Sequence, residues 1–429
     1  MNRTKFWIDT RDSFWFVPMI YSIVSILLVI ITSLLDTWLV NYYRDQLADV
    51  LLTEKDVAIW LYGSLVTAIL TMTTISFSTI MVVLTTYSAQ FSPRTLQDFM
   101  RSSMTHQVLG VDCFGFIFAL INLLLVDKQP LIIGPILMVV IAVVCLAFFV
   151  YFIHYSARWI QVNNLVGKVR HDASKVIRHA YEKEKYGEYE RWDENEINQV
   201  KQDVKKEVFA RQSGYVQYIE WEHIVKWAKK NRCVLDLHVQ MGDFIPKGFP
   251  IISVYRAYDS IYLEELASLL VIGNERTDIQ DVEFMLHKLV EIALRAISPA
   301  INDPHTAINC INRIGTALSE IGSNYKEVRY ITDSNRELRI LNHPKKYEDY
   351  LYKSFYQIIH FAQGDVSIYY NLIEVLYKLM LVSNTTIKQK IWNFHYYVID
   401  SIAWDELSDL DYKHMLSIYE KLKTSCKSS

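Results

Sequence analysis

Four long apolar segments dominate the first third of the chain. Hydrophobic residues run almost without interruption over about 14–39, 58–86, 107–126 and 131–155. About 20 consecutive apolar residues suffice for a helix to cross the ~30 Å hydrocarbon core of a bilayer. The pattern therefore predicts four transmembrane helices and a protein that is embedded in a lipid bilayer, which is its expected partner.

The chain changes character after residue 155. Up to that point it holds 8 Lys/Arg and 10 Asp/Glu, against 36 and 37 afterwards, so the second part is expected to face water. Basic residues that flank the spans collect on one side of the membrane, namely Arg3, Lys5, Arg11, Arg94, Arg101, Arg158, Lys168 and Arg170. Because Lys and Arg favour cytoplasmic loops, both termini of this multi-pass protein are expected in the cytoplasm.

An apolar seam continues beyond the fourth span. Its members alternate in steps of three and four, which predicts a helix: Trp159, Val162, Val166, Val169, Ala173, Val176 and Ala180. The seam is typical either of a coiled-coil stalk between protomers or of an amphipathic helix packed on its own domain. Residues 182–206 are mostly charged and indicate a solvated helix or a linker.

The remaining chain predicts a mixed region. From Ser213, the pattern reads strand, short helix, strand, Gly-Asp turn and strand. With Gly242, Asp243 and Gly248 this stretch resembles the barrel-sandwich fold of biotinyl and lipoyl domains, but no lysine at a hairpin tip supports a carrier role. Helical periodicity follows, with a strand pair at 328–331 and 337–341.

The expected fold is thus a mainly α membrane protein with an α+β cytoplasmic region, which combines a small barrel-like β element with a helical domain. The expected parts are a transmembrane domain (1–155), a stalk and linker (156–212), a β-rich domain (213–272) and a mainly helical domain (273–429).

Composition narrows the function. Net charge is −3 with both signs mixed, so no basic field for nucleic acid exists. The five cysteines are scattered, which indicates neither a disulfide framework nor a zinc site. The chain lacks the phosphate-binding loop, the dinucleotide fingerprint and the common hydrolase motifs. We therefore expect no enzyme activity, no cofactor and no metal.

Hydroxyl groups follow one face of the second predicted span. They recur at helical spacing, interrupted at Met81: Ser64, Thr67, Thr71, Thr74, Ser78, Thr85 and Ser88. Hydroxyls gain nothing from acyl chains, so such a face is expected to turn away from lipid. It serves either close helix packing or the lining of a permeation path.

The third span carries Asp112 and Asn122 on one face. An ionised carboxylate inside a bilayer costs about 2.5–3.5 kcal/mol on insertion scales. Asp112 is therefore interpreted either as a cation or proton site facing the hydroxyls, or as an interfacial residue paired with Arg101 or Arg158.

A polar string follows in the cytoplasmic part. Pro299 is expected to end one helix, Asp303 to cap the next and Pro304 to occupy its first turn. The surrounding residues are alternatively a ligand site, formed by Glu291, Arg295, Ser298, Pro299, Asn302, Asp303, Pro304 and Thr306. Glu283, His287 and Glu291 share a helix face at ligand spacing, but an ordinary ion-paired face is the preferred interpretation.

Three strings together resemble the bacterial predicted-membrane-protein family called domain of unknown function 2254. They are residues 88–94 (Ser-Ala-Gln-Phe-Ser-Pro-Arg), residues 213–216 with 242–244, and residues 281–304, which end in Ser-Pro-Ala-Ile-Asn-Asp-Pro. The resemblance implies a four-span protein of the bacterial plasma membrane with a cytoplasmic domain, and it implies no activity. His305 departs from the aromatic residue associated with the family at that place.

Two functions remain open. The first is a homo-oligomeric ion channel or transporter, lined by the second span and regulated by the cytoplasmic domain. The alternative is a membrane-anchored sensor or scaffold without transport activity, whose cytoplasmic domain binds a small ligand or a protein.

Overall fold

The structure is a computed structural model that describes residues 13–43, 53–90, 99–100, 102–127, 132–181, 187–189, 192–203, 205–256, 263–362 and 364–427. The chain divides into two compact units, Met1–Asn164 and Leu165–Ser429. Each unit is described by itself.

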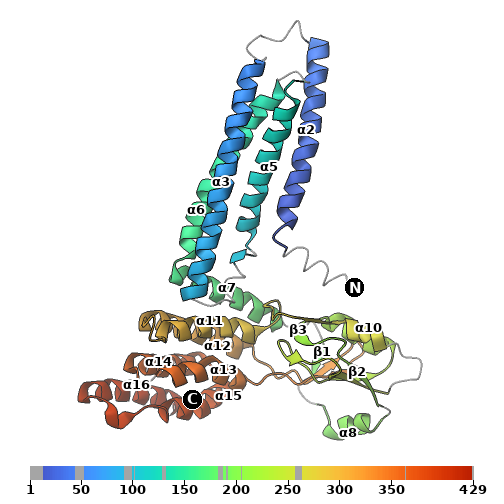
Figure 1. Ribbon diagram of the computed structural model, residues 1–429. Helices are drawn as coiled ribbons and strands as arrows, with labels where there is room; N and C mark the ends of the chain where they lie inside the picture. The colour runs from blue at the N-terminus through green and yellow to red at the C-terminus, as the bar shows by residue number, and fades with distance from the viewer. Residues whose placement is uncertain are drawn as a thin grey trace. The chain divides into compact units, whose positions relative to one another are not determined.

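The N-terminal unit contains four long apolar helices (Figure 1): α2 (Phe16–Tyr43), α3 (Lys55–Gln90), α5 (Ser103–Leu125) and α6 (Ile133–Trp159). All four are long and apolar enough to cross a membrane. The four predicted spans are therefore confirmed as helices of the required length. Half of the most apolar window of α5 is buried, against 22% in each of the other three, so α5 is the central helix.

A buried carboxylate helps to hold this unit together. Asp36 of α2 accepts hydrogen bonds from the backbone N–H groups of Ile133 at 2.8 Å and Gly134 at 3.4 Å. These groups open α6 and have no partner within that helix. Asp36 therefore caps α6 from a neighbouring helix and fixes their register.

The fourth span does not continue as one helix. α6 ends at Trp159, and α7 (Val162–Ala180) is a separate helix that begins after a short break. Tyr87 and Asn164 donate to the last carbonyls of α6, on Trp159 and Arg158. The apolar face of α7 is buried inside the chain at Leu165, Val166, Val169, Ala173 and Ile177. That burial favours the amphipathic helix over the interprotomer stalk.

The C-terminal unit starts with α7 and then forms a mixed region. Its elements are β1 (Gly187–Tyr189), α8 (Glu194–Gln202), β2 (Lys205–Phe209), β3 (Gly214–Ile219), α9 (Trp221–Lys230), β4 (Val234–Leu237), β5 (Phe244–Ile245), β6 (Pro250–Tyr255), α10 (Leu263–Ser268) and β7 (Leu270–Gly273). Helices dominate the rest: α11 (Val282–Ile297), α12 (Pro304–Asn324), β8 (Tyr330–Thr332), β9 (Leu338–Leu341), α13 (Tyr347–Phe361), α14 (Val366–Val382), α15 (Thr385–Ile399) and α16 (Asp409–Lys427).

The strands of the described residues do not close into a barrel, so the barrel-like expectation was wrong. One sheet has the order β1-β8-β9-β4-β6-β2 and the other the order β5-β3-β7. The strands of 213–272 are split between these sheets: β3, β5 and β7 form the smaller one, and β4 and β6 belong to the larger one. In the larger sheet β4 pairs in parallel with β9, with Leu235 opposite Ile340. Strands from beyond residue 272 thus complete the larger sheet.

Candidate functional site

The hydroxyl residues of α3 lie on its outward face. Ser64, Thr67, Thr71, Thr74, Ser78 and Thr85 are all exposed in the single chain, and the side chain of Ser88 lies outside the described part. Five of them donate to the carbonyl four residues back, at 2.6–3.0 Å. The opposite face, with Ile69, Ser76 and Val83, is buried. The hydroxyls are therefore not part of the packing inside one copy of the unit.

Asp112 and Asn122 lie elsewhere, in the interior of the unit. Asp112 is fully buried, and neither of its carboxylate oxygens has a hydrogen-bond partner among the described residues. Asn122 is buried as well and donates to the carbonyl of Phe118 at 2.8 Å. The eight candidates from the spans therefore separate into an outward hydroxyl face and two inward polar groups. Arg101, one proposed partner of Asp112, lies outside the described residues.

The polar string at 298–306 forms the corner between α11 and α12. Asp303 accepts from the backbone N–H and the hydroxyl of Thr306 at 3.1 and 2.6 Å, and Pro304 opens α12. Asn302 takes a left-handed backbone conformation (φ 50°) and donates its N–H to the carbonyl of Ser298 at 2.9 Å. Each of these contacts builds the corner, as a cap and a tight turn require.

The other members of that string do not gather around a pocket. Arg295, Pro299 and Asn302 are exposed, while Glu291 is partly buried on α11. None of the eight lines the pocket described below.

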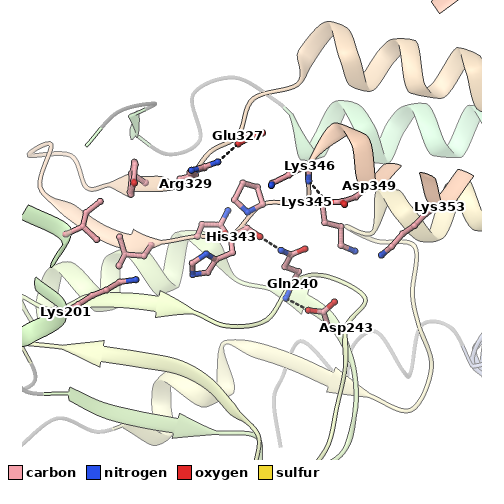
Figure 2. Close-up of a pocket in the computed structure, with 15 residues that line it drawn as sticks. Lys201, Gln240, Asp243, Glu327, Arg329, His343, Lys345, Lys346, Asp349 and Lys353 are labelled. Atoms are coloured by element: carbon pink, nitrogen blue, oxygen red, sulfur yellow. Dashed lines mark hydrogen bonds and ion pairs between the residues drawn. The ribbon is translucent and has the colours of Figure 1, made fainter. Parts of the chain in front are cut away.

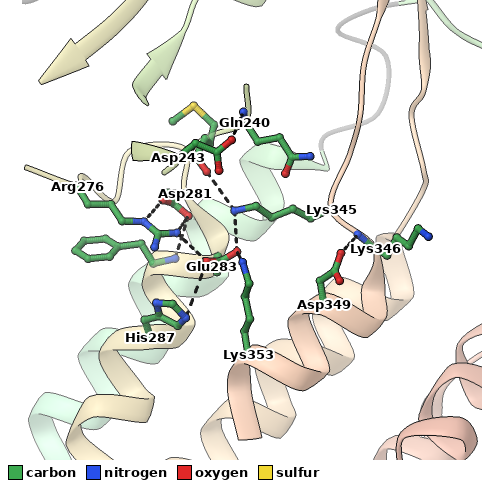
Figure 3. A network of polar contacts seen from close by, with 12 residues as sticks. Gln240, Asp243, Arg276, Asp281, Glu283, His287, Lys345, Lys346, Asp349 and Lys353 are labelled. Atoms are coloured by element: carbon green, nitrogen blue, oxygen red, sulfur yellow. Dashed lines mark hydrogen bonds and ion pairs between the residues drawn. The ribbon is translucent and has the colours of Figure 1, made fainter. Parts of the chain in front are cut away.

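The strongest polar cluster instead surrounds Glu283 on α11 (Figure 3). Its Oε2 lies 2.7 Å from the ammonium of Lys345 and 2.8 Å from that of Lys353, and its Oε1 lies 3.2 Å from Arg276. The Glu283 side chain is only 6% exposed, so its carboxylate is shielded from water, whereas the side chain of Lys353 is 41% exposed. Burial alone raises the pKa of Glu283, but the charges and hydrogen bonds of Lys345 and Lys353 outweigh it and hold the pKa at about 2.

His287 borders the same cluster. Its Nε2 lies 4.0 Å from Oε1 of Glu283. Burial lowers the pKa of His287 to about 4, and the cations of Arg276 and Lys353 add to this against the opposite effect of Glu283. Glu283 thus pairs with lysines and an arginine, and among the described residues no group of three or more His, Cys, Asp or Glu is placed to hold a metal ion.

The Gly242-Asp243 turn of the β region packs closely against this cluster. Arg276 pairs with Asp281 at 2.5 Å, and Asp281 also caps α11 through the N–H of Phe284 at 3.0 Å. A Cβ on Gly242 would lie 2.1 Å from Asp281, and the backbone there has a φ of 84°. Only glycine fits both conditions, so the Gly242-Asp243 turn serves close packing on the Arg276–Asp281 pair.

A pocket of about 630 Å³ lies beside the cluster (Figure 2). Its walls come from α8, the turn between β4 and β5, the start of β8 with the connection before it, the end of β9, the connection from β9 to α13, and α13 itself. The lining residues are Ile197, Lys201, Gln240, Asp243, Glu327, Arg329, Tyr330, Leu341, Asn342, His343, Pro344, Lys345, Lys346, Asp349 and Lys353. Lys345 and Lys353 belong to both the pocket and the Glu283 cluster.

Sequence reasoning missed this pocket and most of the cluster. The helix face of Glu283 was interpreted as an ordinary ion-paired face rather than a metal site, but its partners Lys345 and Lys353 lie about 60 and 70 positions away along the chain and were not predicted. A signal was present in the sequence, because Glu283 lies between apolar residues at the start of a helix with a strongly apolar face. A buried carboxylate needs a cation as its partner, but the sequence pattern does not identify the residue that supplies it.

Comparison with known proteins identifies the family of the chain. A family model described as "Predicted membrane protein (DUF2254)" matches residues 11–378. The chain belongs to this family. This match confirms the resemblance that was based on the strings at 88–94, 213–216 and 281–304. The DUF2254 protein is therefore a predicted membrane protein of unknown function.

Relatives of the DUF2254 protein include uncharacterized proteins of Mycobacterium tuberculosis and Mycobacterium bovis. Each is 28% identical over 279 residues, which cover 61% of this chain and 52% of the relative. The chain therefore spans about half the length of the curated relatives it matches. No solved structure matches it.

Proposed function

We propose that the DUF2254 protein assembles with copies of itself in the membrane and forms a permeation path for ions or small solutes, lined by the hydroxyl face of α3. The supporting observation is the exposure of Ser64, Thr67, Thr71, Thr74, Ser78 and Thr85 on the outside of the single chain. From Ser64 to Thr85 this face is about 32 Å long at 1.5 Å per residue, the thickness of the hydrocarbon core.

The other outer helices support the proposal by contrast. The exposed residues of α6 include Val139, Val140, Val143 and Leu146, and those of α2 include Leu27, Ile30 and Leu34. Those surfaces are aliphatic, as lipid contact requires. Large apolar residues of α3, such as Leu70, Ile75 and Met81, are exposed as well. The row of hydroxyl groups beside them departs from the aliphatic pattern, and contact with a second copy or with a water-filled path would explain it.

The hydroxyls do not require such a partner for their own hydrogen bonds. Because five of them already bond to their helix carbonyls, each hydroxyl contact across helices would add only about 0.6 kcal/mol. Stability alone therefore does not account for the face, whereas a path that solutes follow uses both the small side chains and the exposed oxygen atoms. In this proposal the C-terminal unit and both termini lie in the cytoplasm of a bacterium.

The test measures ion flux from liposomes that contain the purified full chain. The double variant Thr71→Leu/Thr74→Leu should change the flux by tenfold or more, because two bulky apolar groups enter the path. The matched control Val140→Leu/Val143→Leu on α6 adds the same class of side chain to the aliphatic surface and should leave flux unchanged. No flux from the unsubstituted chain, or equal effects of both pairs, would contradict the proposal.

A further inference from the structure

We infer that the pocket beside the Glu283 cluster binds a soluble phosphate-bearing small molecule of about nucleotide size. This inference does not depend on the permeation path, because a chain that conducts nothing can still bind such a ligand. The volume of about 630 Å³ falls within the range of roughly 300–1,000 Å³ that small-molecule sites occupy.

The charges on the pocket wall indicate an anionic ligand. Five Lys or Arg side chains and His343 line it, against three carboxylates. The carboxylates that pair with Lys201, Lys345 and Lys353 belong to Asp236 and Glu283, whose side chains are 6% exposed and which are not among the lining residues. The cations therefore lie between the cavity and the anions behind them.

A ligand can reach several of these cations from water, because Lys201 and Lys353 are each 41% exposed. Lys346 is exposed, and the Arg329 side chain is 54% exposed while it pairs with Glu327 at 2.7 Å. α13 begins at Tyr347, directly after Lys345 and Lys346, and the carboxylate of Asp349 in its first turn already accepts from the backbone N–H of Lys346 at 2.9 Å. Figure 2 shows Lys345, Lys346, Lys353 and His343 arranged around the same space. Phosphate groups suit such a set of lysine and arginine side chains.

The ligand also needs a less polar part. Tyr330, Leu341 and Pro344 contribute apolar surface to the same wall. A phosphate ion alone would leave that surface empty, whereas a phosphorylated organic molecule meets both parts of the pocket. Gln240 and Asn342 add amide groups that can bond to a sugar or a base.

The experiment titrates the full chain in neutral detergent with ATP, pyrophosphate and adenosine and follows its fluorescence. ATP and pyrophosphate should bind saturably, and adenosine should bind at least tenfold more weakly. The double variant Arg329→Gln/Lys346→Gln should weaken ATP binding by about tenfold or more. The reason is that the loss of even one hydrogen bond between charged groups raises the Kd by about that factor. The control Lys413→Gln/Lys421→Gln removes two charges from α16 and should bind ATP as the unsubstituted chain does.

Three outcomes would overturn the inference: no saturable binding of either anion, adenosine binding as tight as that of ATP, or equal losses in both double variants. Phospholipid headgroups also carry phosphate, so the titration is repeated in nanodiscs with and without phosphatidylglycerol. Unchanged ATP affinity supports a soluble ligand, and competition by phosphatidylglycerol would assign the pocket to a headgroup instead.

Discussion

Glu283 shows how much one buried side chain determines about its surroundings. With 6% of its side chain exposed, it holds Arg276, Lys345 and Lys353 within 3.2 Å, and these residues come from three parts of the C-terminal unit. Removing one member of such a buried set leaves the others without compensation, which costs about 3–5 kcal/mol. The cluster therefore fixes α11, α13 and the connection before α13 relative to one another.

The pH dependence of folding follows from His287. Its pKa is lowered from 6.5 to about 4 by burial. Between these values the unfolded chain binds a proton that the folded chain does not, so stability falls as pH drops through this window. From pH 7 to pH 5 the loss due to His287 is on the order of 2 kcal/mol, at about 1.4 kcal/mol per pH unit.

The measurement compares denaturant unfolding of the full chain and of His287→Gln at pH 7 and pH 5. The variant should lose less stability than the unsubstituted chain over this interval. His305→Gln, at an exposed position, serves as the control and should keep the full loss. Identical pH dependence of His287→Gln and the unsubstituted chain would show that His287 is not held neutral.

The contact between α12 and α14 in the C-terminal unit depends on a glycine. A Cβ on Gly315 of α12 would lie 2.5 Å from Cγ1 of Val375 on α14, and Val375 is buried. Gly167 of α7 has no atom within 4 Å of the same position. Close packing therefore requires glycine at position 315. At position 167 it does not, and glycine there only lowers helix stability.

Alanine should act oppositely at these two sites. Gly315→Ala should lower the free energy of unfolding by about 1–3 kcal/mol, because the helices must move apart. Gly167→Ala should raise it by up to about 1 kcal/mol, because alanine is the better helix former. Thermal unfolding of both variants checks this, and stabilisation by Gly315→Ala would mean that α12 and α14 are not in close contact.

Periodicity predicted the long elements well and the short ones poorly. The four spans and the helices from α11 to α16 have apolar faces long enough to define a helix, and β8 and β9 surround a clear turn. β2 was missed because Lys205, Lys206 and Glu207 conceal it within a charged stretch, and its pairing with β6 about 45 residues later defines it. The barrel was wrong for a similar reason, since β9 enters the sheet from a distant segment.

The candidate site was predictable only in part. The hydroxyl spacing on α3 gave its face correctly, but not whether that face is inside or outside one copy, because sequence does not specify which neighbours cover a helix. One of the two interpretations of Asp112 placed it facing the hydroxyls, whereas it lies buried within the unit and they lie outside. Contacts across long sequence distances, such as Glu283 with Lys353, carry no local signal.

Assembly of the proposed path requires that the hydroxyl face of α3 meets another copy of the chain. Figure 1 shows α3 as one of the long helices of the N-terminal unit, and its exposed Ser and Thr residues contrast with the aliphatic surfaces of α2 and α6. If copies assemble through this face, equivalent α3 residues of different copies lie near one another. If they do not, the same residues face lipid.

Cysteine crosslinking in membranes tests this directly. Thr71→Cys places a thiol on the hydroxyl face and Val143→Cys places one on the aliphatic surface of α6, with the unsubstituted chain and its five cysteines as the background. Oxidation should link Thr71→Cys chains into dimers of twice 50.3 kDa on a non-reducing gel, well above the background, while Val143→Cys chains should not form them. Chains of Thr71→Cys that stay at the mass of one copy, or that crosslink no more than Val143→Cys, would contradict the proposed assembly.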